Sequence, residues 1–240
     1  MLLSRFKDDT TVEIGVDEAG RGSFWGPMMA GAVVIPHECE WTEKQQTLLM
    51  KLRDSKKISP KMRETLAVEI RKQLSYCAVG TVSAYEINEQ GVTWANKEAF
   101  RRAIDGIEME EKAGCRLVVD GILPLDMWTG EQDLVIEGDS KYLAIAAASI
   151  LAKVEHDRWI QEYCAAHPEC NERYDLLKSK GYGTTKHREG IRVHGGHELH
   201  RTLYIQNWLP GATRMPKTYK KKGSGTKGEA EDKCLIKFTT

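Results

Sequence analysis

Two adjacent acids, Asp17 and Glu18, follow an apolar run at residues 12–16 and lead into a Gly-Arg-Gly turn at residues 20–22. Burying two such carboxylates is costly unless cations neutralise them, and hard divalent metals are the usual cations of all-oxygen sites. Glycines let the backbone approach a bulky ligand closely, and Arg21 offers a planar fork that suits phosphate. The alternative is a surface turn with two solvated acids, because turns are rich in Gly and Asp.

Two further apolar runs also end in acids. Residues 116–119 lead into Asp120, and residues 134–136 lead into Glu137-Gly138-Asp139. Because ligands of an open α/β sheet lie beyond its strand ends, acids far apart in the sequence can converge there. About four carboxylates repel one another until two divalent cations, roughly 4 Å apart, sit among them. A single strand-end acid is more often a turn former or helix cap, but three similar endings favour a metal site.

Seven short pieces of the sequence share their residue types, order and spacing with one known family. In chain order they are Asp17 to Gly22 with Gly26-Pro27, Asp54-Ser55-Lys56-Lys57, Val119-Asp120-Gly121, Gly138-Asp139, the run 145–154 with Asp157-Arg158, Lys180-Gly181-Tyr182-Gly183-Thr184, and His200-Arg201. On these pieces the chain resembles the ribonuclease HII family, the type 2 ribonucleases H, over about residues 12–205. Two local departures are a longer segment at residues 86–100 and Thr202-Leu203-Tyr204, where bacterial members have a more basic, serine-containing stretch.

The resemblance implies an α/β, ribonuclease H-like fold: a mixed sheet flanked by helices, with a small C-terminal helical segment. It implies an endonuclease that cleaves the RNA strand of RNA/DNA hybrids and incises duplex DNA at embedded ribonucleotides, leaving 5′-phosphate and 3′-hydroxyl ends. The implied catalytic residues, which would also hold two Mg²⁺ or Mn²⁺ ions, are Asp17, Glu18, Asp120 and Asp139. The implied substrate-binding residues are Gly20, Arg21, Gly22, Lys56, Ser149, Lys153 and Tyr182.

Several of the implied residues have an expected position or contact. Neighbours on a strand face apart, so we expect the turn that follows Glu18 to bring it to the metal side. The 20–22 turn would contact the ribose 2′-hydroxyl, which separates RNA from DNA, and Tyr182 would stack on a sugar beyond the scissile phosphate. Ser149 and Lys153 are four residues apart on a helix, and their shared face either reaches the substrate backbone or lines a polar edge.

Two other functions are compatible with parts of the pattern. A DNA-cleaving nuclease or integrase of the same fold would share the acids but would lack a reader of the 2′-hydroxyl. A metal-dependent RNA-binding module would need no turnover. The turn at residues 20–22 and Tyr182 argue against the first alternative, and four intact acids argue against the second.

Composition fits an intracellular enzyme of one domain or two joined ones. The 240 residues contain no apolar run long enough to cross a membrane and no signal peptide, so we expect the protein to stay in the cytoplasm. We also expect it to be a monomer. The six cysteines form no Cys-x-x-Cys pair and are expected to be reduced. Two groups could suggest zinc, but neither has a recognisable fourth ligand, so we expect no zinc site. They are Cys164, His167 and Cys170, and His194, His197 and His200.

The formal net charge is zero, but it is unevenly distributed. Residues 217–240 carry seven lysines and three acids, which leaves the body of the chain acidic. Basic stretches are expected to steer nucleic acid. They are Lys51, Arg53, Lys56 and Lys57, and Lys178, Lys180, Lys186, His187 and Arg188. The tail reads as disordered, and its end, Cys-Leu-Ile-Lys-Phe, allows a weak contact with a replication partner, although it lacks the glutamine of a clamp-binding motif.

The remaining pattern predicts alternating strands and helices. Strands are expected at 12–16, 31–36, 77–83, 116–119 and 134–137, and helices at 59–74, 94–112 and 143–166. The expected division is a catalytic core at 1–170, a helical substrate-binding segment at 171–216 and a basic tail at 217–240. On an unbroken helix Asp157 would lie ~27 Å from Asp139, too far for the same metals. We therefore expect Asp157 to pair with Lys153 or Arg158.

Overall fold

A mixed five-stranded sheet forms the centre of the computed structural model, which describes residues 2–110, 112 and 114–212. The strands are β1 (Glu13–Ala19), β2 (Met28–Val34), β3 (Cys77–Val82), β4 (Arg116–Asp120) and β5 (Gln132–Val135). They lie in the order β3-β2-β1-β4-β5. β1 pairs in parallel with β4, and β4 with β5, whereas β1–β2 and β2–β3 are antiparallel. The predicted mixed sheet is confirmed.

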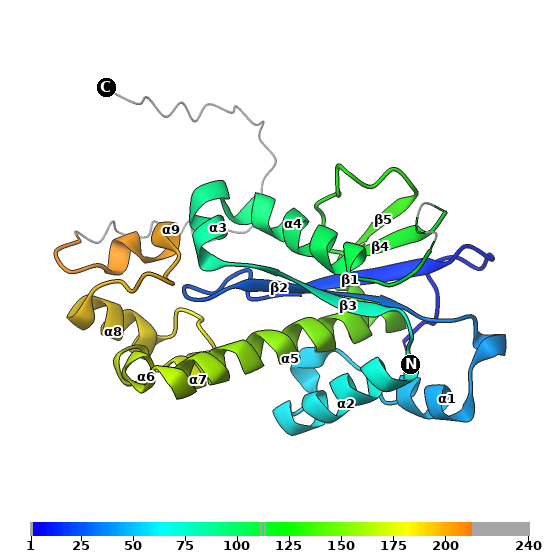
Figure 1. Cartoon of the computed structure of the whole chain (residues 1–240), viewed down its shortest axis with the longest axis horizontal. Coiled ribbons are helices and arrows are strands. Elements are labelled where there is room, and N and C mark those ends of the chain that lie inside the picture. Colours follow the sequence, from blue (N-terminus) through cyan, green and yellow to red (C-terminus); the bar gives the residue numbers. More distant parts are fainter. Residues whose placement is uncertain (1, 111, 113, 213–240) are drawn as a thin grey trace, which may run out of the picture.

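Helices cover both faces of this sheet (Figure 1). The helices α3 (Ala84–Gln90) and α4 (Val92–Asp105) lie on one face, and α1 (Glu43–Leu49), α2 (Pro60–Gln73) and α5 (Leu143–Ala166) lie on the other. Along β1, Ile14 and Val16 join the core beneath α4, whereas Gly15 faces α5. Because side chains alternate along a strand, the same alternation assigns each site residue to a face.

The alanine-rich start of α5 packs directly on the sheet because strand glycines face it. A Cβ added to Gly15 would lie 2.5 Å from the carbonyl carbon of Ala144. A Cβ added to Gly31 would collide with the carbonyl oxygen of Ala148. This close approach brings the polar residues of α5 next to the acids of β1.

Replacing Gly31 by alanine is expected to lower the free energy of unfolding by ~1–3 kcal/mol, because the new methyl group must push the α5 backbone away from β2. Urea unfolding of the two proteins at one pH measures the difference. Gly114→Ala is the matched control, since a Cβ there meets nothing within 4 Å. Equal destabilisation by the two substitutions would show that the contact between β2 and α5 is not tight.

Four short helices follow α5 in the described part of the chain; the first two pack on the far half of α5, and the third packs on the first (Figure 1). They are α6 (Pro168–Tyr174), α7 (Leu176–Ser179), α8 (Thr185–His194) and α9 (Thr202–Ile205). Their buried side chains form one cluster with Trp25, from the loop after β1, and Ile160 of α5. The division at residues 170 and 216 stays a prediction, and the tail at 217–240 lies outside the described residues. None of the helices described is long and apolar enough to cross a membrane.

Several elements differ from the prediction, and β2 and β5 both begin and end earlier in the sequence than expected. The strand β1 continues through Ala19, because its pairing with β2 extends to Ala19 and Met29. The helix α4 ends at Asp105, not near 112, with Gly106 as its C-cap residue, and glycine is a poor helix former. The short helices α1 and α3 were not predicted, although each begins with a capping box, a reciprocal pairing of the N-cap residue with the third helical residue.

Candidate active site

Asp17 lies inside β1, on the face covered by α5. It is 5% exposed, and its Oδ1 accepts a hydrogen bond of 2.7 Å from the backbone N–H of Glu18. The Ser149 hydroxyl on α5 lies close enough to favour the charged form of Asp17. Burial nevertheless raises the pKa of Asp17 well above its ordinary value, and the charges of Glu18 and Asp120 raise it further.

Glu18 reaches the site differently from the prediction. No turn follows it directly, because β1 continues to Ala19, and Glu18 therefore points to the α4 face. Asn96 on α4 and Arg21 lie close enough to favour the charged carboxylate, and Arg21 Nη1 is 3.8 Å from Glu18 Oε1. Asn96 Nδ2 is buried without a hydrogen-bond acceptor among the described residues. Burial raises the pKa of Glu18 despite these two neighbours.

Asp120 and Asp139 come from the part of the sheet beyond β1 that contains β4 and β5. Asp120 ends β4, and its Oδ1 accepts a 2.6 Å hydrogen bond from the N–H of Gly138. Asp139 lies in the short 3-10 turn Gly138–Ser140, so it follows β5 after a bend and does not end the strand itself. Burial raises the pKa of Asp120, and the charge of Asp139 adds to this rise. Lys56 Nζ lies 3.3 Å from Asp139 Oδ2.

A cavity of about 470 Å³ joins most of these groups. Its lining includes Asp17, Glu18, Gly20, Arg21, Gly22, Lys56, Asp120, Ser149, Lys153 and Tyr182. Asp139 does not line it and connects to it through Lys56. Ser55 and Arg63 also line the cavity, and neither was among the predicted site residues. The structure thus gathers ten of the eleven predicted site residues around one space.

The carboxylates fit the donor chemistry of hard divalent cations, because oxygen ligands that raise one another's pKa gain most from a cation between them. The carboxylates do not form a complete set of metal ligands in this structure. Within the described residues, no three His, Cys, Asp or Glu side chains come together as a ready set of metal ligands.

The turn at residues 20–22 forms one wall of the cavity. Gly20 has a φ of 83°, and a Cβ there would lie 2.5 Å from the ring of His156. The N–H of Gly20 donates a 3.3 Å hydrogen bond to the Tyr182 hydroxyl, which fixes the two site elements relative to each other. Arg21 keeps 43% of its side chain exposed and can reach a ligand.

The sequence is similar to those of known proteins over most of its length. A sequence model described as Ribonuclease HII matches residues 14–207. A Ribonuclease HII of Prochlorococcus marinus is 40% identical over 192 residues, which are 80% of this chain and 94% of that protein. The chain belongs to the ribonuclease HII family. It is therefore a metal-dependent ribonuclease, and its classification as an enzyme is confirmed.

Solved structures support the fold of this member of the ribonuclease HII family. The ribonuclease H2 of Pyrococcus horikoshii OT3 matches with a TM-score of 0.64 at 23% identity, over 82% of this chain and 97% of that one. The RNase HII of Archaeoglobus fulgidus, solved in a complex with PCNA, matches with a TM-score of 0.57 at 27% identity, over 85% of this chain and 92% of that one.

On α5 of this ribonuclease HII family member, Ser149 and Lys153 have different surroundings. The hydroxyl groups of Ser149 and Ser55 lie 2.9 Å apart, so Ser149 is held within the protein. Lys153 Nζ lies 2.8 Å from Asp157 Oδ1 and 5.4 Å from the centre of the Tyr182 ring. Of the two predicted partners of Asp157, Lys153 is correct and Arg158 is wrong, because Arg158 pairs with Glu155 at 3.0 Å.

The prediction is wrong for one residue of the basic stretches, His187. His187 is fully buried, and burial lowers its pKa, so it cannot attract nucleic acid as a surface cation. Its Nε2 lies 3.0 Å from Nε2 of His200, and its Nδ1 lies 3.0 Å from the carbonyl oxygen of Tyr182. The histidines and cysteines that could have suggested zinc form no metal-binding group among the described residues.

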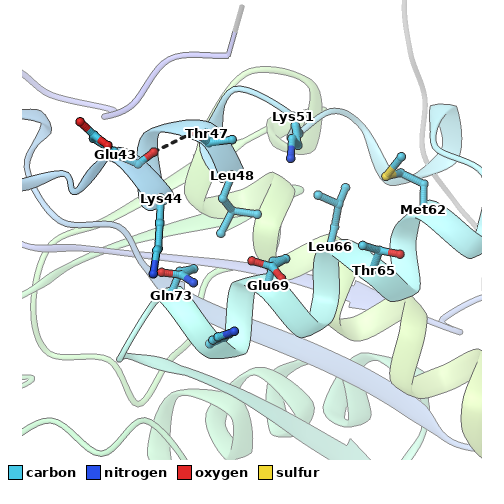
Figure 2. Close-up of a pocket in the computed structure, with 11 residues that line it drawn as sticks. Glu43, Lys44, Thr47, Leu48, Lys51, Met62, Thr65, Leu66, Glu69 and Gln73 are labelled. Carbon is cyan, nitrogen blue, oxygen red and sulfur yellow. Dashed lines mark hydrogen bonds between the residues drawn. The ribbon is translucent and has the colours of Figure 1, made fainter.

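A larger cavity, of about 550 Å³, lies between α1 and α2, away from the acids (Figure 2). Leu48 and Leu66 form part of its lining, with lysines and glutamates of both helices around them. The Thr47 hydroxyl donates a 2.8 Å hydrogen bond to the Glu43 carbonyl within α1. None of the strand-end acids in the described part of the chain lines this groove, so it lacks the chemistry found at the smaller cavity.

Proposed function

We propose that the chain is an endonuclease that hydrolyses the RNA strand of RNA/DNA hybrids and incises duplex DNA at embedded ribonucleotides. The observation that carries the proposal is one cavity in which crowded, buried carboxylates lie next to the Gly-Arg-Gly turn and Tyr182. The acids supply the means of hydrolysis, and the turn and ring supply a way to recognise a ribose.

We propose that Asp17, Glu18, Asp120 and Asp139 hold two divalent cations, Mg²⁺ or Mn²⁺. When bound, such ions lower the pKa of a water molecule towards neutrality and stabilise the leaving 3′ oxygen. The protein contributes the fixed positions of the carboxylates: β1 and β4 hold Asp17 and Asp120, and the turn before α5 holds Asp139. The products would carry a 5′-phosphate and a 3′-hydroxyl.

The substrate contacts follow from the cavity wall. Gly20, Arg21 and Gly22 would contact the 2′-hydroxyl and the neighbouring phosphate, since this turn carries backbone N–H groups and an exposed guanidinium. Lys56 and Lys153 would contact the substrate backbone. Ser149 would act through Asp17 and Ser55, because its hydroxyl is buried between them. Tyr182 would stack on the sugar beyond the scissile phosphate.

A continuous RNA/DNA hybrid with a labelled RNA strand tests this proposal. With Mg²⁺ or Mn²⁺ we expect internal cleavage of the RNA strand, with products that a ligase accepts as 5′-phosphate and 3′-hydroxyl ends. The matched substrate is an all-DNA duplex of the same sequence, which we expect to stay intact. Cleavage of both duplexes at similar rates would instead favour a DNA nuclease.

The cellular setting is part of the same proposal. An enzyme that incises at embedded ribonucleotides would act in the cytoplasm, in the excision repair of DNA, as a monomer. A weak contact with a replication partner would use the tail, residues 217–240, whose structure lies outside the described residues.

Removal of residues 217–240 is expected to weaken substrate binding without changing the cut site. The segment has seven lysines and three acids, a net charge of +4, so its loss should raise KM and reduce the slope of log affinity against log salt by up to about 4. Steady-state kinetics at several salt concentrations measure both effects. Replacing the lysines by glutamine is the control, and it should reproduce the truncation. A lower kcat at saturating substrate would show that the tail does more than increase the affinity for the substrate.

A further inference from the structure

The carbonyl oxygen of Arg21, in the middle of the Gly-Arg-Gly turn, accepts two hydrogen bonds from the C-terminal segment. Arg201 Nη1 donates one at 2.9 Å, and the Tyr204 hydroxyl donates the other at 3.2 Å. Both donors lie about 180 residues further along the chain. The turn is therefore held from outside its own strand and loop.

Arg201 is the inner of these two donors. It is 1% exposed, and its guanidinium also donates to the carbonyl oxygens of Gly26 and Pro27, at 3.1 and 2.8 Å from Nη2. Its own backbone N–H donates a 2.7 Å hydrogen bond to the carbonyl of Phe24. Arg201 thus fixes both ends of the loop that follows β1, and its removal would disturb the fold as well as the turn.

Tyr204 is the outer donor, and removing its hydroxyl would disturb the fold less than removing the Arg201 side chain. It lies on α9, and its ring is 5.9 Å from the ring of Phe24 at a tilt of 48°. Phe24 in turn lies directly against Gly183, next to Tyr182, where an added Cβ would meet the Phe24 ring. The Tyr204 ring is thus held by Phe24, which itself packs against the segment that carries Tyr182.

We infer that Tyr204 is a positioning residue, whose hydroxyl, together with Arg201, orients the Gly-Arg-Gly turn for recognition of the ribose 2′-hydroxyl. This inference rests on the proposed function. A carbonyl that two donors hold cannot rotate freely, so the peptide plane between Arg21 and Gly22 stays fixed. Tyr204 was not among the predicted site residues, and its hydroxyl gives the turn a second donor from the C-terminal segment.

The test compares the wild type with Tyr204→Phe, which keeps the ring and removes the donor. Two duplexes of one sequence are used, an all-DNA duplex and the same duplex with a single ribonucleotide. Their Kd values are measured in Ca²⁺, which we expect to allow binding without turnover. Tyr204→Phe should reduce the preference for the ribonucleotide duplex by roughly two- to fivefold, the effect of one neutral hydrogen bond, and leave the Kd of the all-DNA duplex unchanged.

Two controls separate positioning from general damage. Tyr76→Phe removes a partly exposed hydroxyl outside the cavity and should leave both Kd values and the Tm unchanged. Tyr204→Phe should also leave the Tm unchanged while it lowers kcat more than it raises KM with Mg²⁺. Arg201→Lys, if it folds, should reduce the preference further, because lysine cannot reproduce the guanidinium fork.

The outcomes distinguish this inference from the proposed function. If the wild type prefers the ribonucleotide duplex and Tyr204→Phe retains the full preference, the inference is wrong and the proposed function stands. An equal loss of affinity for both duplexes would also overturn the inference, because it would show a general binding role. A wild type without any preference would contradict the proposed recognition of the 2′-hydroxyl itself.

Discussion

Replacing Asp17 by asparagine is expected to lower the rate of cleavage by roughly a thousandfold or more, because the substitution removes a charge that would hold the proposed cations. The same substitution should raise the free energy of unfolding in metal-free buffer. Asp17 is buried beside Glu18 and Asp120, and its charged form is disfavoured in the folded protein. A neutral amide of the same shape avoids that cost. The corresponding amide variants of Glu18, Asp120 and Asp139 should also be inactive.

The pH dependence of this stability gain follows from the direction of the pKa shift. A carboxyl group whose folded pKa is raised binds its proton more tightly in the folded state. Its stabilising contribution is present below the unfolded pKa, near ~4, and is lost as the pH rises through the raised folded pKa. Asp17→Asn should therefore exceed the wild type in stability most at neutral pH, and the difference should vanish in acid.

Urea unfolding in EDTA at pH 7 and pH 4, together with cleavage rates in Mg²⁺, measures both effects. Asp126→Asn is the matched control, because the Asp126 side chain is 77% exposed, pairs only with Lys97 among the described residues, and does not line the cavity. It should keep full activity and show no such pH-dependent gain. Near wild-type cleavage by any two of the four active-site variants would overturn the four-acid assignment.

Replacing Tyr182 by alanine is expected to reduce kcat/KM on a single ribonucleotide in DNA by roughly ten- to hundredfold, the value of one stacking contact of ~1–3 kcal/mol. The loss on a continuous hybrid should be smaller, because there the nucleotide beyond the scissile phosphate is a ribose and not the deoxyribose that the ring is proposed to sense. Lys153 lies over this ring but is also anchored by Asp157, so removing the ring should not displace the lysine.

Measurement of kcat/KM for both variants of Tyr182 on both substrates separates the ring from its hydroxyl. Tyr182→Phe keeps the ring and removes only the acceptor for the Gly20 N–H. It should therefore retain most of the activity that Tyr182→Ala loses. If Tyr182→Ala lost the same factor on both substrates, the ring would not read the junction between ribonucleotide and DNA.

The sequence was sufficient for the parts of the fold that depend on local patterns. The strands that carry Asp17 and Asp120 are short apolar runs, and the helix Pro60–Gln73 begins with Ser59 as N-cap and Pro60 as first residue, as predicted. The long helix Leu143–Ala166 matches its predicted bounds. In each case the signal lies within a few residues of the element that it specifies.

The features that the sequence did not reveal depend on contacts between distant segments. Glu18 faces α4 because pairing with β2 extends β1, and that extension is a tertiary effect. His187 lies in a basic stretch of the sequence, but it is buried against His200. Arg201 belonged to a recognised motif, yet its role in holding the Arg21 carbonyl became visible only when the two segments were placed side by side.

We propose that this cavity cleaves a phosphodiester beside a ribose and not beside a deoxyribose. Two end-labelled duplexes that differ by one 2′-hydroxyl, incubated with the full-length protein and Mg²⁺, test it most directly, with Asp120→Asn as the inactive control. We expect one cut next to the ribonucleotide, no cut in the all-DNA duplex, and no cut by Asp120→Asn. Cutting of both duplexes, or cutting that survives in Asp120→Asn, would contradict it.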